Sequence, residues 1–432
     1  MKRSALIQLE EWKNRKIRKP LIIKGARQVG KTWLMLEFAR TAFTKFVYVN
    51  FEEDEVLNHV FENDFDTERI INAISLRKNV DIDADTLIIF DEIQAARRGV
   101  MSLKYFCEKA PQYYIIAAGS LLGISIHKGD SFPVGKVEFL NLYPMNFREF
   151  LLATGKDKFV EIIEKQDWQL VAMVKDKLIR CLKEYYIVGG MPEAVKSFAE
   201  TGDFEEVRRI QANILLTYES DFSKHAPANE VPRIVMVWNS ITAQLAKENR
   251  KFIYGMLRHG ARAKEFELAL EWLKDSGLIS IVKRTKKGEL PLNAFEDFSS
   301  FKVFLLDIGL MTAINKLPAE TVLNGNEIFS TFRGALTEQY VCQQLVGAVD
   351  MLYYWSADNS QGEIDFLVQN GGVVIPVEVK AEENLKAKSL AAFVAKNPSL
   401  HGLRLSMSDY REQDWMANVP LYGVFSIFPE KH

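Results

Sequence analysis

A glycine-rich octapeptide near the N-terminus constrains the fold of this chain more than any other segment. Residues 25–32 read Gly-Ala-Arg-Gln-Val-Gly-Lys-Thr, which fits the pattern G-x-x-x-x-G-K-[ST] at every required position. In such a loop the glycines let backbone N–H groups curl around phosphate oxygens, and the following helix points its first amides at the anion. An apolar strand is expected before the loop, at Lys19–Lys24, and a helix after it, at Gly30–Thr41. We therefore predict a phosphate-binding loop at the end of a buried strand.

The same loop predicts a nucleotide with a bound metal ion. All eight residues are expected to contact the phosphates: Gly25, Ala26, Arg27, Gln28, Val29, Gly30, Lys31 and Thr32. Lys31 should reach the β and γ phosphates and support catalysis with its charge, and the Thr32 hydroxyl should ligate Mg²⁺. The alternative is a glycine turn that binds no nucleotide, which the flanking strand and helix disfavour. ATP and Mg²⁺ are therefore the predicted cofactors.

An acidic pair at the end of a second apolar strand completes the predicted site. Leu87–Phe90 reads Leu-Ile-Ile-Phe, and Asp91 and Glu92 follow it. In open α/β sheets ligands bind at the carboxyl ends of the strands, where Asp91 is expected. Asp91 is predicted to hold the Mg²⁺ shell, and Glu92 is predicted to polarise the attacking water. The alternative for the pair is a solvated loop or the N-cap of a helix.

Apolar strands alternate with helical patterns through the first third of the chain. Further strands are expected at Phe46–Val49, Thr86–Phe90 and Tyr113–Ala118, and further helices at Thr67–Arg77 and Met101–Lys109. This alternation predicts a parallel sheet with helices on both faces, and continuous apolar strands fit burial on both sides. The predicted fold class is therefore α/β, with a doubly wound parallel sheet around the phosphate-binding loop.

Composition places the chain among folded proteins of a reducing compartment. It has 432 residues, too many for one ordinary domain, and a formal charge of −2, which argues neither for nor against nucleic acid. Cys107, Cys181 and Cys342 match no metal or disulfide spacing. No apolar run is long enough to cross a bilayer, and residues 1–18 lack the apolar core of a signal peptide. We expect a cytoplasmic protein with no membrane partner.

The middle of the chain predicts helices followed by a basic hairpin. Long helical stretches run to about Ser220, and three shorter helices are expected at Ile234–Lys247, Phe252–Leu257 and Ala263–Ser276. A hairpin from Leu278–Lys283, turning at residues 286–288, would then form the wing of a winged-helix module. The basic residues of this region are Arg258, His259, Arg262, Lys264, Lys283, Arg284, Lys286 and Lys287. Such a wing can contact DNA phosphates, and the alternative is a solvated hairpin.

A second group of polar residues lies in the last third of the chain. A helix at Phe332–Val346 carries Glu338, and strands follow at Leu352–Trp355, Ile364–Val368 and Val373–Val379. The turn Gly371-Gly372 predicts a hairpin that brings Asp365 opposite Glu378, with Lys380 on the same face as Glu378. Glu338, Asp365 and Glu378 could hold Mg²⁺ or Mn²⁺, with Lys380 beside them to orient water. This arrangement resembles the PD-(D/E)XK nuclease core, and the alternative is a retained fold without catalysis.

The acidic pair after an apolar strand, with the octapeptide before it, resembles the AAA+ branch of P-loop ATPases. That resemblance implies a polar sensor of the γ-phosphate after the next strand, a position that Ser120 occupies. It also implies a catalytic arginine from a neighbouring subunit, which makes a homo-oligomer one option. No arginine of this chain can be assigned to that role. A helix N-cap is the alternative for Ser120.

Several further motifs resemble one family of bacterial and archaeal AAA+ ATPases that carry a C-terminal domain of unknown function. They are FDEIQ at Phe90–Gln94, AAGS at 117–120, LYPMNFREFL at Leu142–Leu151, GGMPEA at 189–194, FKVFLLDIGL at Phe301–Leu310, Arg333-Gly334-Ala335 with Glu338, Gly362–Phe366 and Val377–Lys380. The resemblance covers nearly the whole chain. The family usually has Gly-Arg where this chain has Gly135-Lys136, so Lys136 could replace an arginine finger with a weaker point charge.

The resemblance implies four regions. They are an AAA+ domain at 1–150, a helical region at 151–230, a winged-helix-like domain at 231–315 and a small restriction-nuclease-like α/β domain at 316–432. The leading hypothesis is an ATPase that acts on nucleic acid, with ATP and DNA as partners. The alternatives are an ATPase whose C-terminal domain only recognises protein or DNA, and a slow STAND-like signalling switch.

Overall fold

The computed structural model describes residues 2–119, 132–247, 250–325, 330–358, 362–383 and 387–430. These residues divide into two compact units. The N-terminal unit holds Arg3–Tyr143 with Asp275–Gly277, and the C-terminal unit holds Pro144–Lys274 and Leu278–Lys431. Within the described ranges, no helix is both long and apolar enough to span a bilayer.

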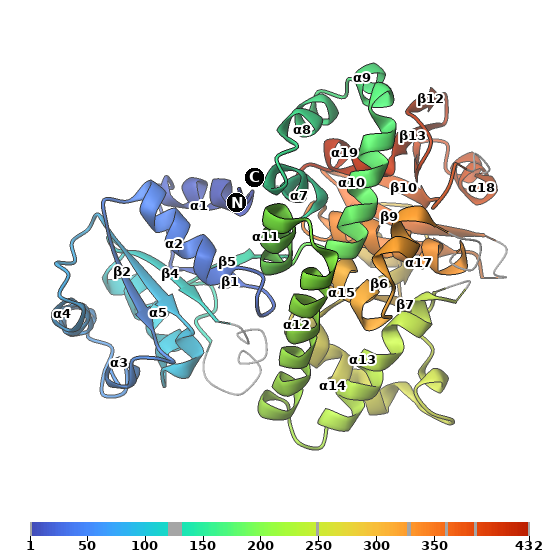
Figure 1. Cartoon of the computed structure of the whole chain (residues 1–432). Coiled ribbons are helices and arrows are strands. Elements are labelled where there is room, and N and C mark those ends of the chain that lie inside the picture. The colour runs from blue at the N-terminus through green and yellow to red at the C-terminus, as the bar shows by residue number, and fades with distance from the viewer. Residues whose placement is uncertain are drawn as a thin grey trace. The chain divides into compact units, whose positions relative to one another are not determined.

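Five parallel strands form the sheet of the N-terminal unit in the order β2-β3-β4-β1-β5 (Figure 1). The strands are β1 (Leu21–Lys24), β2 (Lys45–Asn50), β3 (Thr86–Asp91), β4 (Tyr114–Ala118) and β5 (Glu138–Asn141). The prediction of a parallel sheet is confirmed, and its first four strands lie where the sequence places them. The sequence did not reveal β5, because this edge strand has one buried residue, Leu140, and therefore no apolar run.

Helices of the N-terminal unit pack against both faces of this sheet. They are α1 (Ala5–Lys13), α2 (Lys31–Ala42), α3 (Glu55–Asn58), α4 (Thr67–Lys78), the short η1 (Ile93–Ala95) and α5 (Gly99–Lys109). Asp66 caps the start of α4, because its carboxylate accepts hydrogen bonds from the amides of Glu68 and Arg69, and left-handed Asn79 caps its end. Every residue of Leu87–Phe90 is 0% exposed, as a strand covered on both faces requires.

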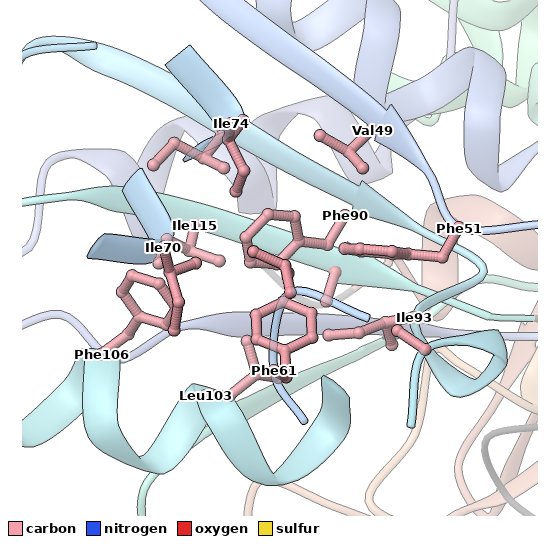
Figure 2. Packing of buried hydrophobic residues seen from close by; sticks show 14 of the residues in the cluster. Val49, Phe51, Phe61, Ile70, Ile74, Phe90, Ile93, Leu103, Phe106 and Ile115 are labelled. Atoms are coloured by element: carbon pink, nitrogen blue, oxygen red, sulfur yellow. The ribbon is translucent and has the colours of Figure 1, made fainter. Parts of the chain in front are cut away.

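An aromatic cluster anchors the end of β3 (Figure 2). The Phe90 ring lies 5.5 Å from Phe51 and 6.0 Å from Phe61, centroid to centroid, in edge-on contacts. Phe106 of α5 and Ile70 of α4 belong to the same buried cluster. This packing fixes the strand end from which Asp91 and Glu92 emerge.

The C-terminal unit is built on a mixed sheet of eight strands in the order β12-β13-β11-β10-β9-β8-β6-β7. The strands are β6 (Ile279–Thr285), β7 (Glu296–Leu305), β8 (Met351–Ser356), β9 (Glu363–Asn370), β10 (Val373–Val379), β11 (Gly402–Ser406), β12 (Arg411–Gln413) and β13 (Met416–Pro420). The β9–β10 hairpin turns at Gly371 and Gly372, with φ of 55° and 79°, as the sequence predicts.

The strand pair that was expected as a wing belongs to this large sheet. Strand β6 pairs antiparallel with β7 and also pairs parallel with β8, and β7 forms the sheet edge. The β6–β7 connection is longer than the predicted turn at 286–288 and contains the short η3 (Leu292–Phe295). The expected helix at Phe252–Leu257 is only a short turn, η2 (Tyr254–Met256). The winged-helix interpretation is therefore not confirmed.

Helices make up the remainder of the C-terminal unit. They are α7 (Phe147–Ala153), α8 (Asp157–Glu164), α9 (Trp168–Met173), α10 (Lys175–Val188), α11 (Pro192–Thr201), α12 (Phe204–His225), α13 (Val231–Leu245), α14 (Ala263–Asp275), α15 (Ile308–Ile314), α16 (Ala319–Asn324), α17 (Ser330–Leu345), α18 (Lys388–Lys396), η5 (Leu421–Gly423) and α19 (Val424–Ile427). Against the sheet, α17 packs on β7 and β10, and α18 packs on β9, β10 and β11.

Asp307 explains two of the sequence motifs in structural terms. Its fully buried carboxylate accepts hydrogen bonds from Gly190 N (2.6 Å), Leu310 N (2.9 Å) and Gln343 Nε2 (3.0 Å). A Cβ on Gly190 would lie 1.9 Å from the carbonyl oxygen of Met145, so only glycine fits there. Asp307 therefore links the GGMPEA and LLDIGL segments to each other and to α17.

Candidate functional site

The predicted phosphate-binding loop connects β1 to α2. It starts after Lys24, the last residue of β1, and α2 begins at Lys31. Gly30 has a φ of 94°, and a Cβ on Gly25 would lie 2.3 Å from the carbonyl oxygen of Leu142. Both glycines are therefore required by the backbone, one for its left-handed conformation and one for a close approach. All eight predicted residues thus lie together at the carboxyl end of β1.

Lys31 is folded onto its own loop. Its Nζ donates hydrogen bonds to the carbonyl oxygens of Gly25 (2.9 Å) and Ala26 (2.8 Å), and the residue is only 6% exposed. Burial lowers the pKa of Lys31 to about 8, against the opposing charges of Glu92 and Asp91. Among the described residues, the hydrogen bonds of this buried ammonium go to carbonyl oxygens, which carry no full negative charge, so this position fits an anionic phosphate.

The metal-binding half of the predicted site converges on the same place. Thr32 Oγ1 donates a hydrogen bond of 2.7 Å to Asp91 Oδ2, which joins the first turn of α2 to the end of β3. The Tyr48 hydroxyl, on β2, donates to the same oxygen at 2.9 Å. Burial raises the pKa of Asp91, although these hydrogen bonds oppose the rise. A hydroxyl and a carboxylate this close fit the ligand set that Mg²⁺ prefers.

Tyr48 and Arg3 are contributors that the sequence analysis missed. The Arg3 guanidinium is buried and donates to the carbonyl oxygens of Val29 (3.1 Å) and Tyr143 (2.7 Å). It thereby fixes the backbone of the phosphate-binding loop from the side. Neither residue belongs to a motif, and only the folding of the unit brings them to the loop.

Glu92 is held beside Asp91 by a short local turn. It has a left-handed φ of 48° and precedes η1, so it takes the N-cap position that the sequence allowed. Gln94 Nε2 donates a hydrogen bond of 2.5 Å to Glu92 Oε2. The Glu92 carboxylate is therefore oriented by Gln94 and does not cap the short helix. Ser120, the expected γ-phosphate sensor, lies outside the described residues.

Lys136 has a partner within the N-terminal unit. Its Nζ lies 2.9 Å from Glu108 Oε1, and this hydrogen bond raises the pKa of the lysine. Both side chains are more than a third exposed, so this ion pair contributes little to stability and leaves Lys136 able to take another partner. The replacement of an arginine finger by Lys136 stays a prediction.

The four C-terminal residues singled out by sequence lie close together in the C-terminal unit. The β9–β10 register pairs Val377 with Phe366, and its next step places Glu378 opposite Asp365. Asp365 Oδ2 accepts a hydrogen bond of 2.8 Å from the amide of Val379, and Lys380 Nζ lies 2.8 Å from Glu378 Oε1. Burial raises the pKa of Glu378, and the nearby Asp365 charge adds to the rise against Lys380.

Glu338, from α17, meets two cations that the sequence analysis did not consider. Arg250 Nη1 lies 2.5 Å from one of its carboxylate oxygens, and Lys302 Nζ lies 3.6 Å from the other. Lys302 is 0% exposed and also contacts Glu363 at 2.5 Å. Burial opposes the charge of Lys302, but these carboxylates raise its pKa. Glu338 thus already has positive partners, while burial and Asp365 raise its own pKa.

Two carboxylate oxygens of this cluster, Glu338 Oε2 and Glu378 Oε2, are buried and accept no hydrogen bond from any residue that the structure describes. Lys302 Nζ lies 3.6 Å from Glu338 Oε2, which leaves Glu378 Oε2 as the better placed of the two to meet a cation. In those same residues, however, no three His, Cys, Asp or Glu side chains are arranged to hold a metal ion. The residues present therefore fit a metal at Asp365 and Glu378 better than one shared by all three carboxylates.

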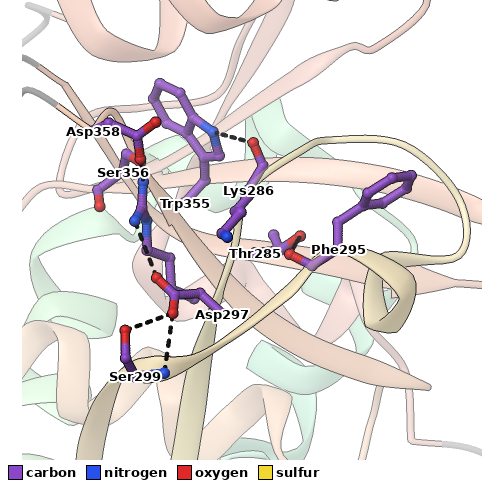
Figure 3. A network of polar contacts seen from close by, with 9 residues as sticks. Thr285, Lys286, Phe295, Asp297, Ser299, Trp355, Ser356 and Asp358 are labelled. Atoms are coloured by element: carbon purple, nitrogen blue, oxygen red, sulfur yellow. Dashed lines mark hydrogen bonds and ion pairs between the residues drawn. The ribbon is translucent and has the colours of Figure 1, made fainter.

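Two basic residues at the end of β6 are paired with acids. Lys283 contacts Glu296. Arg284 contacts Asp297 at 3.1 Å and also Asp358, and both of these acids are labelled in Figure 3. Arg284 also donates to the carbonyl oxygen of Ser356. These two cations hold the sheet edge together, so they are poorly placed to bind DNA phosphates.

Comparisons with known proteins give domain-level assignments. The AAA domain family matches residues 17–151, a domain of unknown function (DUF8612) matches 179–321, and another (DUF4143) matches 333–422. An uncharacterized protein of Methanocaldococcus jannaschii is 23% identical over 402 residues, covering 91% of this chain and 82% of that protein. Residues 17–151 are therefore an AAA-type P-loop ATPase domain.

Solved structures with similarity to the chain include a Walker-type ATPase and an ORC1 protein. A Walker-type ATPase of Pyrococcus abyssi aligns with a TM-score of 0.45 and 16% identity over 72% of this chain and 94% of its own. The ORC1 protein of Aeropyrum pernix, solved in complex with DNA, aligns with a TM-score of 0.30 and 14% identity over 74% and 93% of the two chains.

Proposed function

We propose that the N-terminal unit binds ATP with Mg²⁺ and hydrolyses it. The observation that carries the proposal is the 2.7 Å hydrogen bond between Thr32 and Asp91, which are 59 residues apart in the sequence. It joins the phosphate-binding loop and the acidic strand end at one point, as a nucleotide with its metal requires. The matched AAA domain supports the same activity.

Each residue has a distinct part in this proposal. Lys31 exchanges its two carbonyl partners for the phosphates, and the loop amides from Gly25 to Thr32 surround the anion. Thr32 and Asp91 would hold Mg²⁺, which when bound neutralises charge that develops on the phosphates. Glu92 orients and polarises the attacking water, and Ser120 senses the γ-phosphate.

The test is the conservative change Glu92→Gln. This variant should bind ATP like the wild type and hydrolyse it at least about tenfold more slowly, because only the water-polarising carboxylate is lost. Glu55→Gln, on the exposed start of α3, is a matched control that should hydrolyse ATP normally. Wild-type turnover by Glu92→Gln would assign the base elsewhere, and loss of ATP binding by the same variant would contradict its assigned role.

We further propose that the C-terminal unit acts on nucleic acid and that Asp365 and Glu378 bind a divalent cation. The buried, unbonded Oε2 of Glu378 supports this, because a desolvated carboxylate oxygen without a partner is costly. Calorimetry with Mn²⁺ should show binding to the wild type and none to Asp365→Asn. Asp350→Asn, at the exposed turn before β8, serves as the control. Equal Mn²⁺ binding by the wild type and Asp365→Asn would contradict a metal site at Asp365.

A non-catalytic role of the C-terminal unit is the second candidate. The specific observation in its favour is that Glu338 already forms ion pairs with Arg250 and Lys302, whereas in a nuclease its carboxylate would help to ligate the metal. In that case the chain is an ATP-dependent switch whose C-terminal unit recognises DNA or protein. Mg²⁺-dependent cutting of DNA distinguishes the nuclease, whereas ATP-dependent homo-oligomerisation without cutting favours the switch.

A further inference from the structure

A small pocket in the C-terminal unit combines two aromatic rings with two lysines. Trp355 comes from β8, and Phe393, Lys388 and Lys396 come from α18. The pocket has a volume of about 240 Å³. That is below the range of about 300–1,000 Å³ typical for drug-sized ligands, so it suits a single planar ring system.

The two rings form fixed walls rather than a closed stack. Their centroids lie 4.7 Å apart at an interplanar angle of 58°, so neither ring covers the face of the other. The Trp355 indole is half-buried, and its Nε1 donates to the carbonyl oxygen of Lys286, which is visible in Figure 3. Phe393 is only 3% exposed and is anchored in the core below. The indole therefore offers a rigid surface for stacking.

The charge around the rings is positive. Lys388 and Lys396 lie two turns apart on one face of α18, about 12 Å along the helix, and both are exposed. Neither forms an ion pair with another residue in the described part of the chain, and the described pocket lining contains no acidic side chain. Unpaired lysines on either side of an aromatic surface attract a ligand with a planar ring and flanking negative charges.

The β6–β7 connection adds to this rim. A Cβ on Gly288 would lie 2.8 Å from Cζ of Phe393, so the connection runs directly against the pocket wall. Lys286 and Lys287, which precede Gly288, are exposed at the same place, and Lys287 Nζ lies 3.6 Å from Glu289 Oε1. The lysines that resembled a DNA-binding wing thus border the aromatic pocket.

We propose that this pocket binds one unstacked base of a single-stranded nucleic acid, with the lysines on the adjoining phosphates. The proposal rests on the nucleic-acid function proposed above and names the form of nucleic acid and the point of contact. Base stacking on Trp355 would supply affinity without sequence preference, because every base has a planar face. A duplex would not fit, because its bases are stacked and cannot enter a pocket of this size.

The proposal is tested with fluorescein-labelled oligothymidylate and the full chain, by anisotropy at several salt concentrations. Lys388→Ala/Lys396→Ala should reduce the slope of log K against log salt by about 1.4, because each single-strand phosphate contact contributes about 0.7. Trp355→Leu should weaken binding roughly 5- to 150-fold with an unchanged slope, as for the loss of one base stack. Trp355→Phe, which keeps an aromatic face, should restore most of the affinity.

The exposed pair Lys196 and Lys224, on α11 and α12, provides the matched control for charge. Lys196→Ala/Lys224→Ala should bind like the wild type, because neither lysine lines the pocket. If the Lys388→Ala/Lys396→Ala variant binds with the affinity and salt slope of the wild type, the pocket proposal is overturned, but a nucleic-acid function is not. Failure of the wild type to bind oligothymidylate, oligouridylate and duplex DNA would overturn both, whereas binding of duplex DNA without binding of either oligonucleotide would overturn only the pocket.

Discussion

Raising the pH should weaken ATP binding through Lys31. In the free protein this lysine has a pKa of about 8, because it is buried against carbonyl oxygens. Phosphate groups favour the charged form, so the pKa of the lysine must rise when ATP binds. A group whose pKa rises on binding takes up a proton, and affinity is therefore lost as the pH increases through the lower pKa.

The expected size follows from the charged fraction of Lys31. With a pKa of about 8, the protonated fraction falls from about 76% at pH 7.5 to about 3% at pH 9.5. The affinity should decrease roughly 25-fold over this range, equivalent to about 1.9 kcal/mol. The nucleotide itself contributes little, because the last phosphate ionisation lies near pH 6. At pH 9, binding should take up about 0.9 proton per nucleotide.

Isothermal titration calorimetry measures both quantities. Affinities at several pH values give the slope, and titrations at pH 9 in two buffers of different ionisation enthalpy give the proton uptake. Lys31→Ala is the internal control, because its weaker residual binding should be independent of pH and release or take up no proton. A wild-type affinity that stays constant from pH 7.5 to 9.5, or an equal slope in Lys31→Ala, would refute the reasoning.

Three further predictions follow from individual hydrogen bonds. Gln94→Ala should raise the basal ATP hydrolysis rate roughly 2- to 10-fold, because it releases Glu92 from one hydrogen bond; an unchanged or lower rate in a phosphate-release assay contradicts this. Tyr48→Phe should cost the N-terminal unit roughly 1–3 kcal/mol in chemical denaturation, because the buried Asp91 loses a donor, and Mg²⁺ with ATP should reduce the loss. Asp307→Ala should destabilise the C-terminal unit by at least about 3 kcal/mol, since two buried amides and the partly buried Gln343 side chain lose their acceptor, and a wild-type denaturation midpoint would show that water replaces it.

The position of β6 shows where prediction from sequence reached its limit. Its pattern correctly indicated a strand that turns back on a neighbour, as β6 and β7 do. The parallel pairing of Lys283–Thr285 with Tyr353–Trp355 joins segments about seventy residues apart, and no local pattern encodes such a choice. A basic hairpin that looked like a free wing therefore became an inner strand of a sheet, with Arg284 paired to acids.

The sequence by itself determined the features that depend on neighbouring residues. The octapeptide at 25–32 placed the phosphate-binding loop, Leu87–Phe90 placed a buried strand, and Gly371-Gly372 placed a hairpin with its register. In each case, local backbone conformation and the alternation of buried residues are dictated by chain segments of a few residues.

Only the tertiary structure decided which groups surround these features. Tyr48 binds Asp91, and Lys302 binds Glu338. In each pair the two residues come from different strands or helices, and no spacing in the sequence marks them as partners. Lys302 is the clearest case, because a lysine in an apolar strand can be completely buried only where carboxylates from other elements offset its desolvation. The charges that decide how each site works are thus set by long-range packing, which fixes the surroundings of a side chain only when the whole sheet has formed.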